Sequence, residues 1–561
     1  MGSGNNDHQS SFVSASRRTV LETLGVTAVG LSIGGAERVA GVGDEPAEQG
    51  SDPHDRKYDA LQLRALINWK TLNGADPVPD PKTAWEREGY SDHAASYTKG
   101  LPHDDLGLVD PEAYDALKTA MVSGDPKDFT RIPLGEGTRQ LKNPQAAFSF
   151  ELVGPDSHAN VAPKPPSLES AEAAAEMVDC YWRSECRDVP FREFSESDRV
   201  AAAVAELSNL SDYPDPIHGD EVTTETVFRP FDLSGPTISQ FMLQPYARGA
   251  LQVEQRIRTG SADSEYLTDY DEWLASRRGA PPSQSHSFDD TERFVHDGRS
   301  LAEFVHEDVP NQSFDSAVLM LLGRQAPVNP TLPFEGAPLD PNIPFEPGGP
   351  EVPFVNYGFF DAIDAVTSML DVALNAAWYN KWGVYNRLRP ETFGGLVHNH
   401  VTGKKEFPIH DDLLEATVLE RVHDTHGTYL LPVAYPEGAP LHPAYPSGHA
   451  TVAGACATAL KAYFDESYVF PDPVVPTADG TDLDSIDADL TLGKETDKLA
   501  ANIANGRIWA GLHYWSDAVE GLRLGEELAI SVLRSRKELS NHADFFEGWQ
   551  LTRFDGETIT V

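Results

Sequence analysis

The stretch that decides the fold reads LHPAYPSGHATVAGA and covers residues 441–455. Its small residues predict a helix, and Ser447 is a preferred N-cap residue for the start of that helix. Free N–H groups and the helix dipole favour an oxyanion at a helix N-terminus, and glycine lets the anion approach the backbone closely. Ser447, the amide of Gly448 and the imidazole of His449 are therefore a candidate oxyanion site. The alternative is that Ser447 only caps the helix.

Helical patterns recur outward from this stretch in both directions. They cover residues 167–182, 200–207, 301–322, 359–382, 413–422, 449–464 and 500–534. The alternation of apolar and polar residues that is typical of strands is nearly absent. We therefore predict a mainly α fold of two helical halves, each resembling a four-helix bundle, with long loops between the helices.

Composition divides the chain into five predicted parts. Nine prolines lie between Pro327 and Pro353, which neither a helix nor a central strand tolerates. The predicted parts are an export signal and linker start (1–45), an N-terminal region packed on the core (46–145), a first helical half (146–330), a Pro-rich connection (331–355) and a second, catalytic helical half (356–550).

The charge balance is strongly acidic. The 561 residues contain 88 Asp and Glu against 44 Lys and Arg, a net charge of −44. This charge argues against nucleic acid and anionic membranes as general partners. Because 40% of the residues are hydrophobic, the chain still has enough apolar material for a core. A surface of this kind is typical of halophilic proteins, and the alternative is a host that is only biased toward acidic residues.

The N-terminal sequence contains a possible export signal. Arg17 and Arg18 precede a short apolar run to Gly35, which resembles a twin-arginine export signal, and residues 41–55 read as a solvated linker. The alternative is a chance arginine pair in a frayed terminus. Elsewhere the sequence has no apolar run of eighteen residues, so we expect no membrane span.

Three cysteines limit the possible disulfides. Cys180 and Cys186 are six residues apart and could pair, whereas Cys456 lies in the predicted small-residue helix and is expected to be buried.

Two further segments carry basic residues. Lys381 and Arg389 are eight apart, and Pro390 ends the helix there, which favours a basic pair facing a cavity over the alternative of a solvated helix terminus. Arg507 could hold an oxyanion bidentately. His513 and Asp517 are four apart on one helix face, so the carboxylate could orient the imidazole, unless the two are a simple surface pair.

These segments together resemble a known family. The order Lys-x7-Arg-Pro, Pro-Ser-Gly-His, Arg-x5-His-x3-Asp resembles the vanadium-dependent haloperoxidases, which share their oxyanion site with type 2 phosphatidic acid phosphatases. Segments 148–156, 177–191 and 235–244 look like the bromoperoxidase branch, so the resemblance covers residues 144–536.

The resemblance implies a function and a role for each residue. It implies a vanadate cofactor bonded to His513 as the vanadium ligand, with Lys381, Arg389, Ser447, Gly448 and Arg507 binding its oxygens and Asp517 supporting His513. His449, His513 and Lys381 would be catalytic. His442 and Trp378 would form the halide site and favour bromide and iodide over chloride. The partners would be hydrogen peroxide, a halide and a small organic acceptor, and a homo-oligomer is possible.

Two rival functions stay open at this point. The first is an acid phosphatase that uses His513 as the nucleophile on phosphate esters. The second is a non-catalytic exported oxyanion-binding protein. Against the phosphatase stand Lys381, Trp382 and His442, which are features of the peroxidase branch.

The sequence also departs from the family pattern. Gly506 stands where many members have serine, and Tyr385-Asn386 where relatives often have His-Arg. We expect residues 398–400 (His-Asn-His) to form a loop rather than a second metal site. The acid-rich residues 479–489 lack the order of a calcium loop and are expected to be a solvated loop.

Overall fold

The computed structural model describes residues 63–65, 90, 92–151, 154–213, 222–229, 235–334, 351–543 and 545–561. The chain divides into two units, Met1–Gly74 and Ala75–Val561. Only residues 63–65 of the first unit are described, and they are helical. The predicted export signal at Arg17 and Arg18, the linker at 41–55 and residues 335–350 of the Pro-rich connection lie outside the described residues.

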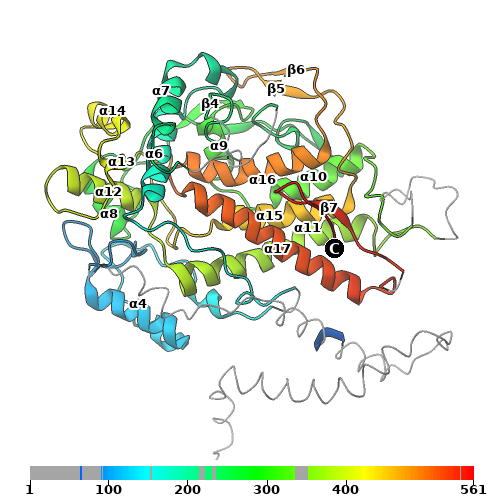
Figure 1. Ribbon diagram of the computed structural model, residues 1–561, viewed down its shortest axis with the longest axis horizontal. Coiled ribbons are helices and arrows are strands. Elements are labelled where there is room, and N and C mark those ends of the chain that lie inside the picture. Colours follow the sequence, from blue (N-terminus) through cyan, green and yellow to red (C-terminus); the bar gives the residue numbers. More distant parts are fainter. Residues whose placement is uncertain are drawn as a thin grey trace, which may run out of the picture. The chain divides into compact units, whose positions relative to one another are not determined.

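The second unit consists mainly of helices, which confirms the predicted fold class (Figure 1). Its helical elements are α4 (Pro111–Ser123), α5 (Pro126–Phe129), η1 (Pro144–Phe148), α6 (Ala171–Cys186), η2 (Phe191–Glu196), α7 (Asp198–Leu207), η3 (Gln240–Met242), α8 (Tyr270–Arg277), α9 (Gly298–Phe304), α10 (Gln312–Gly323), α11 (Phe359–Trp378), η4 (Tyr379–Tyr385), α12 (Pro390–Val401), α13 (Asp411–Leu414), α14 (Thr417–His426), α15 (Gly448–Tyr463), α16 (Leu492–Trp509) and α17 (Trp515–Leu539).

The strands are short and pair locally. Four antiparallel two-stranded sheets are formed among the described residues. They pair β1 (Tyr246–Arg248) with β2 (Leu251–Val253), β3 (Ile257–Gly260) with β4 (Phe288–Arg293), β5 (Val474–Pro476) with β6 (Leu483–Ser485), and β7 (Gln550–Thr552) with β8 (Thr558–Thr560).

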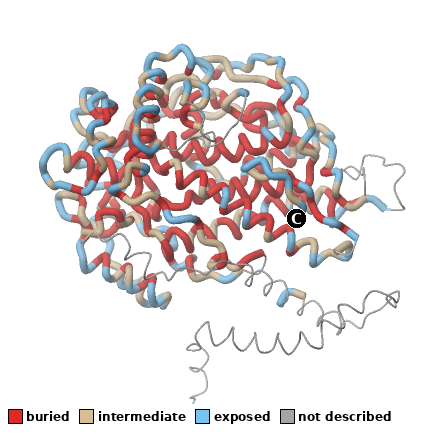
Figure 2. Tube along the Cα trace, viewed as in Figure 1, coloured by how far each residue is buried: buried red, intermediate tan, exposed pale blue. Residues whose placement is uncertain are grey.

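Helix α15, which begins in the opening stretch, lies at the centre of the second unit. It packs against α11, α16 and α17 (Figure 1), and the helices at the centre are buried (Figure 2). Its small residues explain this position, because they let neighbouring backbones approach closely. A Cβ atom on Gly454 would lie 2.1 Å from the carbonyl oxygen of Leu522, and one on Gly525 of α17 would lie 2.1 Å from that of Thr451. The close contact between α15 and α17 therefore requires glycine on both helices.

Two long helices predicted from the sequence are each broken. The prediction over 301–322 is wrong at residues 305–311, which connect α9 to α10, where Pro310 lacks the N–H group that a continuous helix needs. The prediction over 500–534 is wrong at residues 510–514, where Gly511 has φ +78° and ends the first helix. Both breaks carry residues of the candidate site.

Three smaller predictions are also settled. Residues 398–400 lie on the last turn of α12 and do not form the expected loop. Cys180 and Cys186 are both free and buried, so the two do not pair, while Cys456 is buried as predicted. Residues 479–489 are largely loop, with β6 inside them.

One core extends through helices from both predicted halves. The largest cluster of buried apolar residues includes Met177 of α6, Val318 of α10 and Leu528 of α17. The described N-terminal residues also contact this part of the chain, because Lys99 forms a fully buried ion pair with Glu391 of α12 at 2.6 Å. The domain boundaries stay predictions.

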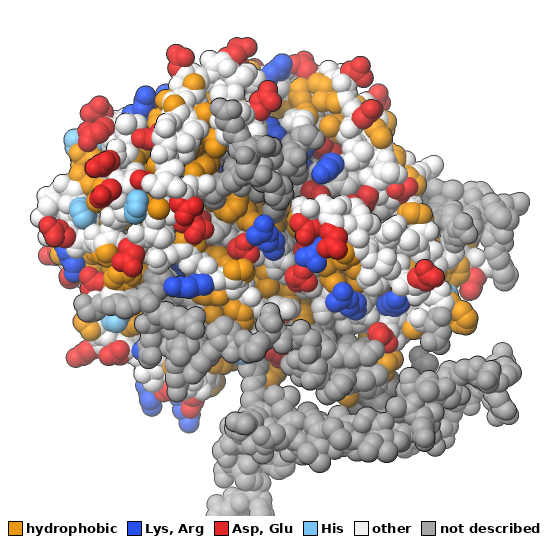
Figure 3. Space-filling model, in the orientation of Figure 1, with side chains coloured by type: hydrophobic (Ala, Val, Ile, Leu, Met, Phe, Trp, Pro, Cys, Tyr) orange, Lys and Arg blue, Asp and Glu red, His pale blue; other side chains and the backbone are white. Residues whose placement is uncertain are grey.

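The surface agrees with the composition. On the face shown in Figure 3, acidic side chains are scattered over the described surface. Among the helices of the described residues, none combines the length and the hydropathy that crossing a membrane requires.

Candidate active site

Five separate segments bring the predicted residues together around the N-terminus of α15. Lys381 lies in the π-helical η4, and Arg389 is the N-cap of α12. Arg507 lies in the last turn of α16, and His513 lies in the connection that precedes α17. The two helix breaks and the π-helical turn therefore position side chains of the candidate site.

The three cations of this site are buried, and none of them has a carboxylate partner among the described residues. Lys381 donates through Nζ to the carbonyl oxygens of Pro443 (2.8 Å) and Ala444 (2.7 Å). Arg389 donates to the carbonyl of Leu512 at 2.7 Å. Arg507 donates to the carbonyl of Val305 at 2.6 Å, and its Nε atom is buried without a hydrogen-bond partner. Buried charge without a counter-ion is costly, so this donor set fits a bound anion.

Burial also perturbs the titration of these groups. Burial, followed by the nearby Arg389, lowers the pKa of Lys381 well below its ordinary value. Burial lowers the pKa of Arg389 to about 10. Both shifts disfavour the charged forms, and an anion placed among the three cations would reverse this effect.

His513 is held in one orientation from both of its ring nitrogens. Its Nδ1 lies 2.8 Å from Oδ2 of Asp517, and its Nε2 lies 2.8 Å from an Nη1 donor of Arg389. The carboxylate accepts a hydrogen bond from the Nδ1–H group, so Nε2 carries the lone pair. Burial, together with Arg389 and Lys381, lowers the pKa of His513 well below its ordinary value. The imidazole is therefore neutral and can act as a ligand or a nucleophile through Nε2.

Asp517 is itself fixed by a buried network that the sequence did not reveal. Nη1 of Arg387 donates to Asp517 at 2.9 Å, and Nη2 of Arg387 donates to Glu176 of α6 at 2.7 Å. The Arg387 guanidinium also lies 3.9 Å from the ring centre of Tyr514. Arg387 belongs to the predicted basic segment, but its partner Glu176 is 211 residues away, so no local pattern links them.

Ser447 caps α15, and Gly448 lies near Lys381, while their role in binding an oxyanion stays a prediction. Ser447 is the N-cap of α15 and accepts a hydrogen bond from the Ala450 amide at 3.4 Å. Gly448 follows it in the first turn, and a Cβ atom there would lie 3.5 Å from both Leu374 and Trp378 and 4.0 Å from Cε of Lys381. The cap and the candidate anion site therefore share one helix end.

His449 has a carboxylate partner in the break between α9 and α10. Its Nε2 lies 2.7 Å from Oδ1 of Asp308, while Oδ2 of Asp308 is buried without a hydrogen-bond partner. Burial lowers the pKa of His449, and Asp308 opposes this shift. Asp308 was missed because residues 301–322 read as one helix. Pro310, two residues later, is the signal that marks the break.

His442 and Trp378 lie together beside the cations. Their ring centres are 4.8 Å apart, and Nδ1 of His442 lies 3.0 Å from Nη2 of Arg389. Burial and Arg389 lower the pKa of His442 well below its ordinary value, so this ring is neutral. Trp378 and Leu374 line a cavity of about 730 Å³ that borders the N-terminus of α15.

The structure explains both departures from the family pattern. A Cβ atom on Gly506 would lie 2.8 Å from the carbonyl oxygen of Leu301, so α16 packs on α9 too closely for serine without movement of α9. Asn386 has φ +46° and ends η4, a left-handed conformation that asparagine tolerates better than most residues.

Known proteins of one family match nearly the whole chain. The chain is 35% identical to the vanadium-dependent bromoperoxidase of Ascophyllum nodosum, over 92% of this chain and 94% of that protein. The chain belongs to the vanadium-dependent haloperoxidases. The corresponding bromoperoxidase of Corallina pilulifera is 32% identical over 83% of this chain and 91% of its own length, which places the chain in the bromoperoxidase branch of this haloperoxidase family.

Fold comparisons agree with this membership. The family model described as the VCPO second helical-bundle domain matches residues 365–542, which contain Lys381, Ser447 and His513. The solved homohexameric structure of the second vanadate-dependent bromoperoxidase of Ascophyllum nodosum matches with a TM-score of 0.82 at 27% identity, covering 93% of this chain and 95% of that chain. The roles of individual site residues in this haloperoxidase stay predictions.

Proposed function

We propose that this protein is a vanadate-dependent haloperoxidase that uses hydrogen peroxide to oxidise bromide, and also iodide, to hypohalous acid, which halogenates an organic acceptor. The observation that carries the proposal is the convergence of Lys381, Arg389 and Arg507 on a neutral His513, without a carboxylate partner for any of the three cations among the described residues. A site with this charge fits vanadate, an oxyanion that accepts one imidazole ligand. Vanadium would take the place of Arg389 Nη1 at the Nε2 lone pair of His513, and Arg389 would then donate to an oxygen of the oxyanion.

The residues would hold the cofactor as follows. Nε2 of His513 would supply the ligand, and Asp517 keeps the proton on Nδ1 so that Nε2 carries the lone pair. Lys381, Arg389, Arg507, Ser447 and the amide of Gly448 donate to the oxyanion. When bound, vanadate supplies Lewis-acid activation of peroxide without a change in the oxidation state of vanadium.

His449 would accept a proton from the incoming hydrogen peroxide. Its side chain is 19% exposed, so it can be reached from solvent, and its lowered pKa keeps it neutral and able to accept a proton near pH 7. Asp308 then stabilises the imidazolium that forms. Lys381 polarises the substrate at the cation cluster.

His442 and Trp378 would bind the halide. Both lie beside the cation cluster, and His442 contacts Arg389 directly. Bromide as the substrate is supported by the names of the relatives, which are bromoperoxidases. The cavity of about 730 Å³ beside Trp378 would admit a small organic acceptor.

The protein would work outside the cell of a halophile. The twin-arginine pattern at Arg17 and Arg18 supports export, and the net charge of −44 supports a high-salt environment. The homohexameric structure of the related Ascophyllum nodosum enzyme supports a homo-oligomer.

Reconstitution tests the function. Protein freed of vanadium and then incubated with vanadate in high salt should gain bromination of an organic acceptor that depends on both peroxide and bromide. Folding is checked by circular dichroism before and after. Folded protein that gains no bromination, or that hydrolyses a model phosphomonoester faster than it brominates, would contradict the proposal and favour the phosphatase.

A further inference from the structure

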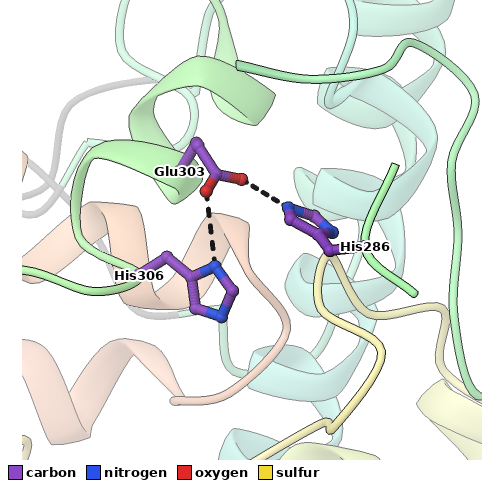
Figure 4. A group of neighbouring side chains, drawn as sticks. All are labelled: His286, Glu303 and His306. Carbon is purple, nitrogen blue, oxygen red and sulfur yellow. Dashed lines mark hydrogen bonds and ion pairs between the residues drawn. The ribbon is translucent and has the colours of Figure 1, made fainter. Parts of the chain in front are cut away.

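A second cluster of metal-binding side chains lies outside the vanadate site. His286 precedes β4, Glu303 lies on α9, and His306 follows α9 directly. One ligand atom from each of these residues lies within 4.8 Å of the other two. Figure 4 shows both imidazole rings directed at the carboxylate of Glu303 from different sides.

The three side chains are joined by hydrogen bonds that bring their possible ligand atoms close together. Nε2 of His286 lies 2.7 Å from Oε2 of Glu303, and Nδ1 of His306 lies 3.3 Å from its Oε1. Each histidine directs its other ring nitrogen to a fixed oxygen, since Nδ1 of His286 lies 3.3 Å from the hydroxyl of Tyr266 and Nε2 of His306 lies 2.7 Å from Glu437. Outer partners of this kind orient the histidines that bind metals.

The surroundings suit a small divalent cation. The three side chains are only 11–12% exposed, so an ion there would be partly desolvated while still reaching solvent. Glu303 and Glu437 supply negative charge, and the ring of Tyr435 stacks on His306 at 3.7 Å, which fixes its plane. Two imidazoles and one carboxylate are a ligand set that zinc prefers.

We propose that His286, Glu303 and His306 form a three-residue site for a zinc-type divalent cation, with a fourth position open to water. The ion would replace the protons that now lie between the ring nitrogens and the carboxylate of Glu303. The ion would join the segment before β4, helix α9 and the connection that follows it. That connection carries Val305, which binds Arg507, and Asp308, which binds His449, so the ion would stiffen one wall of the vanadate site.

Cobalt titration tests this site. Co²⁺ replaces zinc in sites of this type and reports its ligand geometry by visible absorption. The full chain, loaded with vanadate, is titrated with Co²⁺ in high NaCl and excess Mg²⁺, because Mg²⁺ occupies the acidic oxygen sites of the surface and binds imidazole poorly. The expected result is one equivalent of Co²⁺ with the absorption of an imidazole-containing site, displaced by one equivalent of Zn²⁺.

The variants decide between a metal site and a network of hydrogen bonds. His286→Gln and His306→Gln should each weaken Co²⁺ binding at least tenfold and abolish the rise in Tm that Zn²⁺ produces. His426→Gln, on α14, is the matched control and should bind as the unmodified protein does. Glu303→Gln provides a further variant, and circular dichroism selects the variants that fold. No visible Co²⁺ spectrum in the unmodified protein, or equal Co²⁺ affinity in all folded variants, would overturn the proposal.

Discussion

At the scale of single residues, the partner of His449 sets the pH range of the reaction. Asp308 raises the pKa of His449 against the effect of burial. In Asp308→Asn this support is lost, so the pKa of His449 falls and the neutral, proton-accepting form persists to lower pH. The acidic limb of the rate profile should move down by about one pH unit. The measurement is the pH dependence of bromination.

Glu307→Gln is the control for this prediction, because it removes a neighbouring exposed carboxylate that has no contact with His449. Its acidic limb should stay in place. A limb that does not move in Asp308→Asn would show that Asp308 has no influence on the pKa of His449, and a limb that moves to higher pH would contradict the predicted direction.

Asp517 carries a second prediction at this scale. Asp517→Asn removes the carboxylate that holds the proton on Nδ1 of His513 and that balances Arg387. Vanadate affinity should fall about 10- to 100-fold. Equilibrium dialysis with vanadate measures it, and Glu520→Gln, on the same helix, is the control. Unchanged affinity in Asp517→Asn would mean that Asp517 does not orient the ligand.

At the scale of helices, the packing of α15 on α17 depends on glycine. In Gly525→Ala the added methyl group would lie 2.1 Å from the Thr451 carbonyl oxygen, so the helices must separate. The free energy of unfolding should fall by about 3 kcal/mol. Gly323→Ala, where the added methyl group meets no atom within 4 Å, should change it by less than about 1 kcal/mol. Chemical denaturation measures both, and equal values would contradict the packing argument.

The sequence predicted helices and local motifs well, and it predicted their interruptions poorly. Residues that act within one segment, such as Ser447 with Gly448, or His513 with Asp517, were found because their spacing is local. The breaks at 305–311 and 510–514 were missed because the apolar pattern continues across them. These breaks are set by Pro310 and by the left-handed Gly511.

Partners distant in sequence could not be predicted from one chain. Asp308 is 141 residues from His449, and Glu176 is 211 residues from Arg387. Both carboxylates lie in segments that read only as helix, and tertiary packing alone brings them to the site. Buried acids in predicted helices were therefore the weakest signals in the sequence, although Asp308 contacts His449 and Glu176 is linked to His513 through Arg387 and Asp517.

At the scale of the whole molecule, the net charge of −44 predicts that salt stabilises the fold. Carboxylates on the surface repel one another, and the screening length shrinks from about 10 Å at 0.1 M salt to about 3 Å at 1 M. The Tm should therefore rise as NaCl increases from 0.1 M to molar concentrations. Differential scanning calorimetry measures the shift. A Tm that stays level or falls over this range would contradict adaptation to high salt.

The acidic composition of this enzyme and the three buried cations of the candidate site have different expected roles. The surface charge governs solubility and salt response, whereas Lys381, Arg389 and Arg507 create a local positive site that the net charge does not reveal. The net charge thus argues against nucleic acid and anionic membranes as general partners, whereas the three cations favour a small anion at the candidate site.

The most direct test of this account is anomalous diffraction from crystals soaked in vanadate. The account predicts one strong vanadium peak bonded to Nε2 of His513 and surrounded by Lys381, Arg389, Arg507 and the N-terminus of α15. The same soak of His513→Ala should give no vanadium peak bonded to a protein ligand at this position. A vanadium peak elsewhere in the chain, or none in crystals whose cation site is otherwise intact, would contradict it.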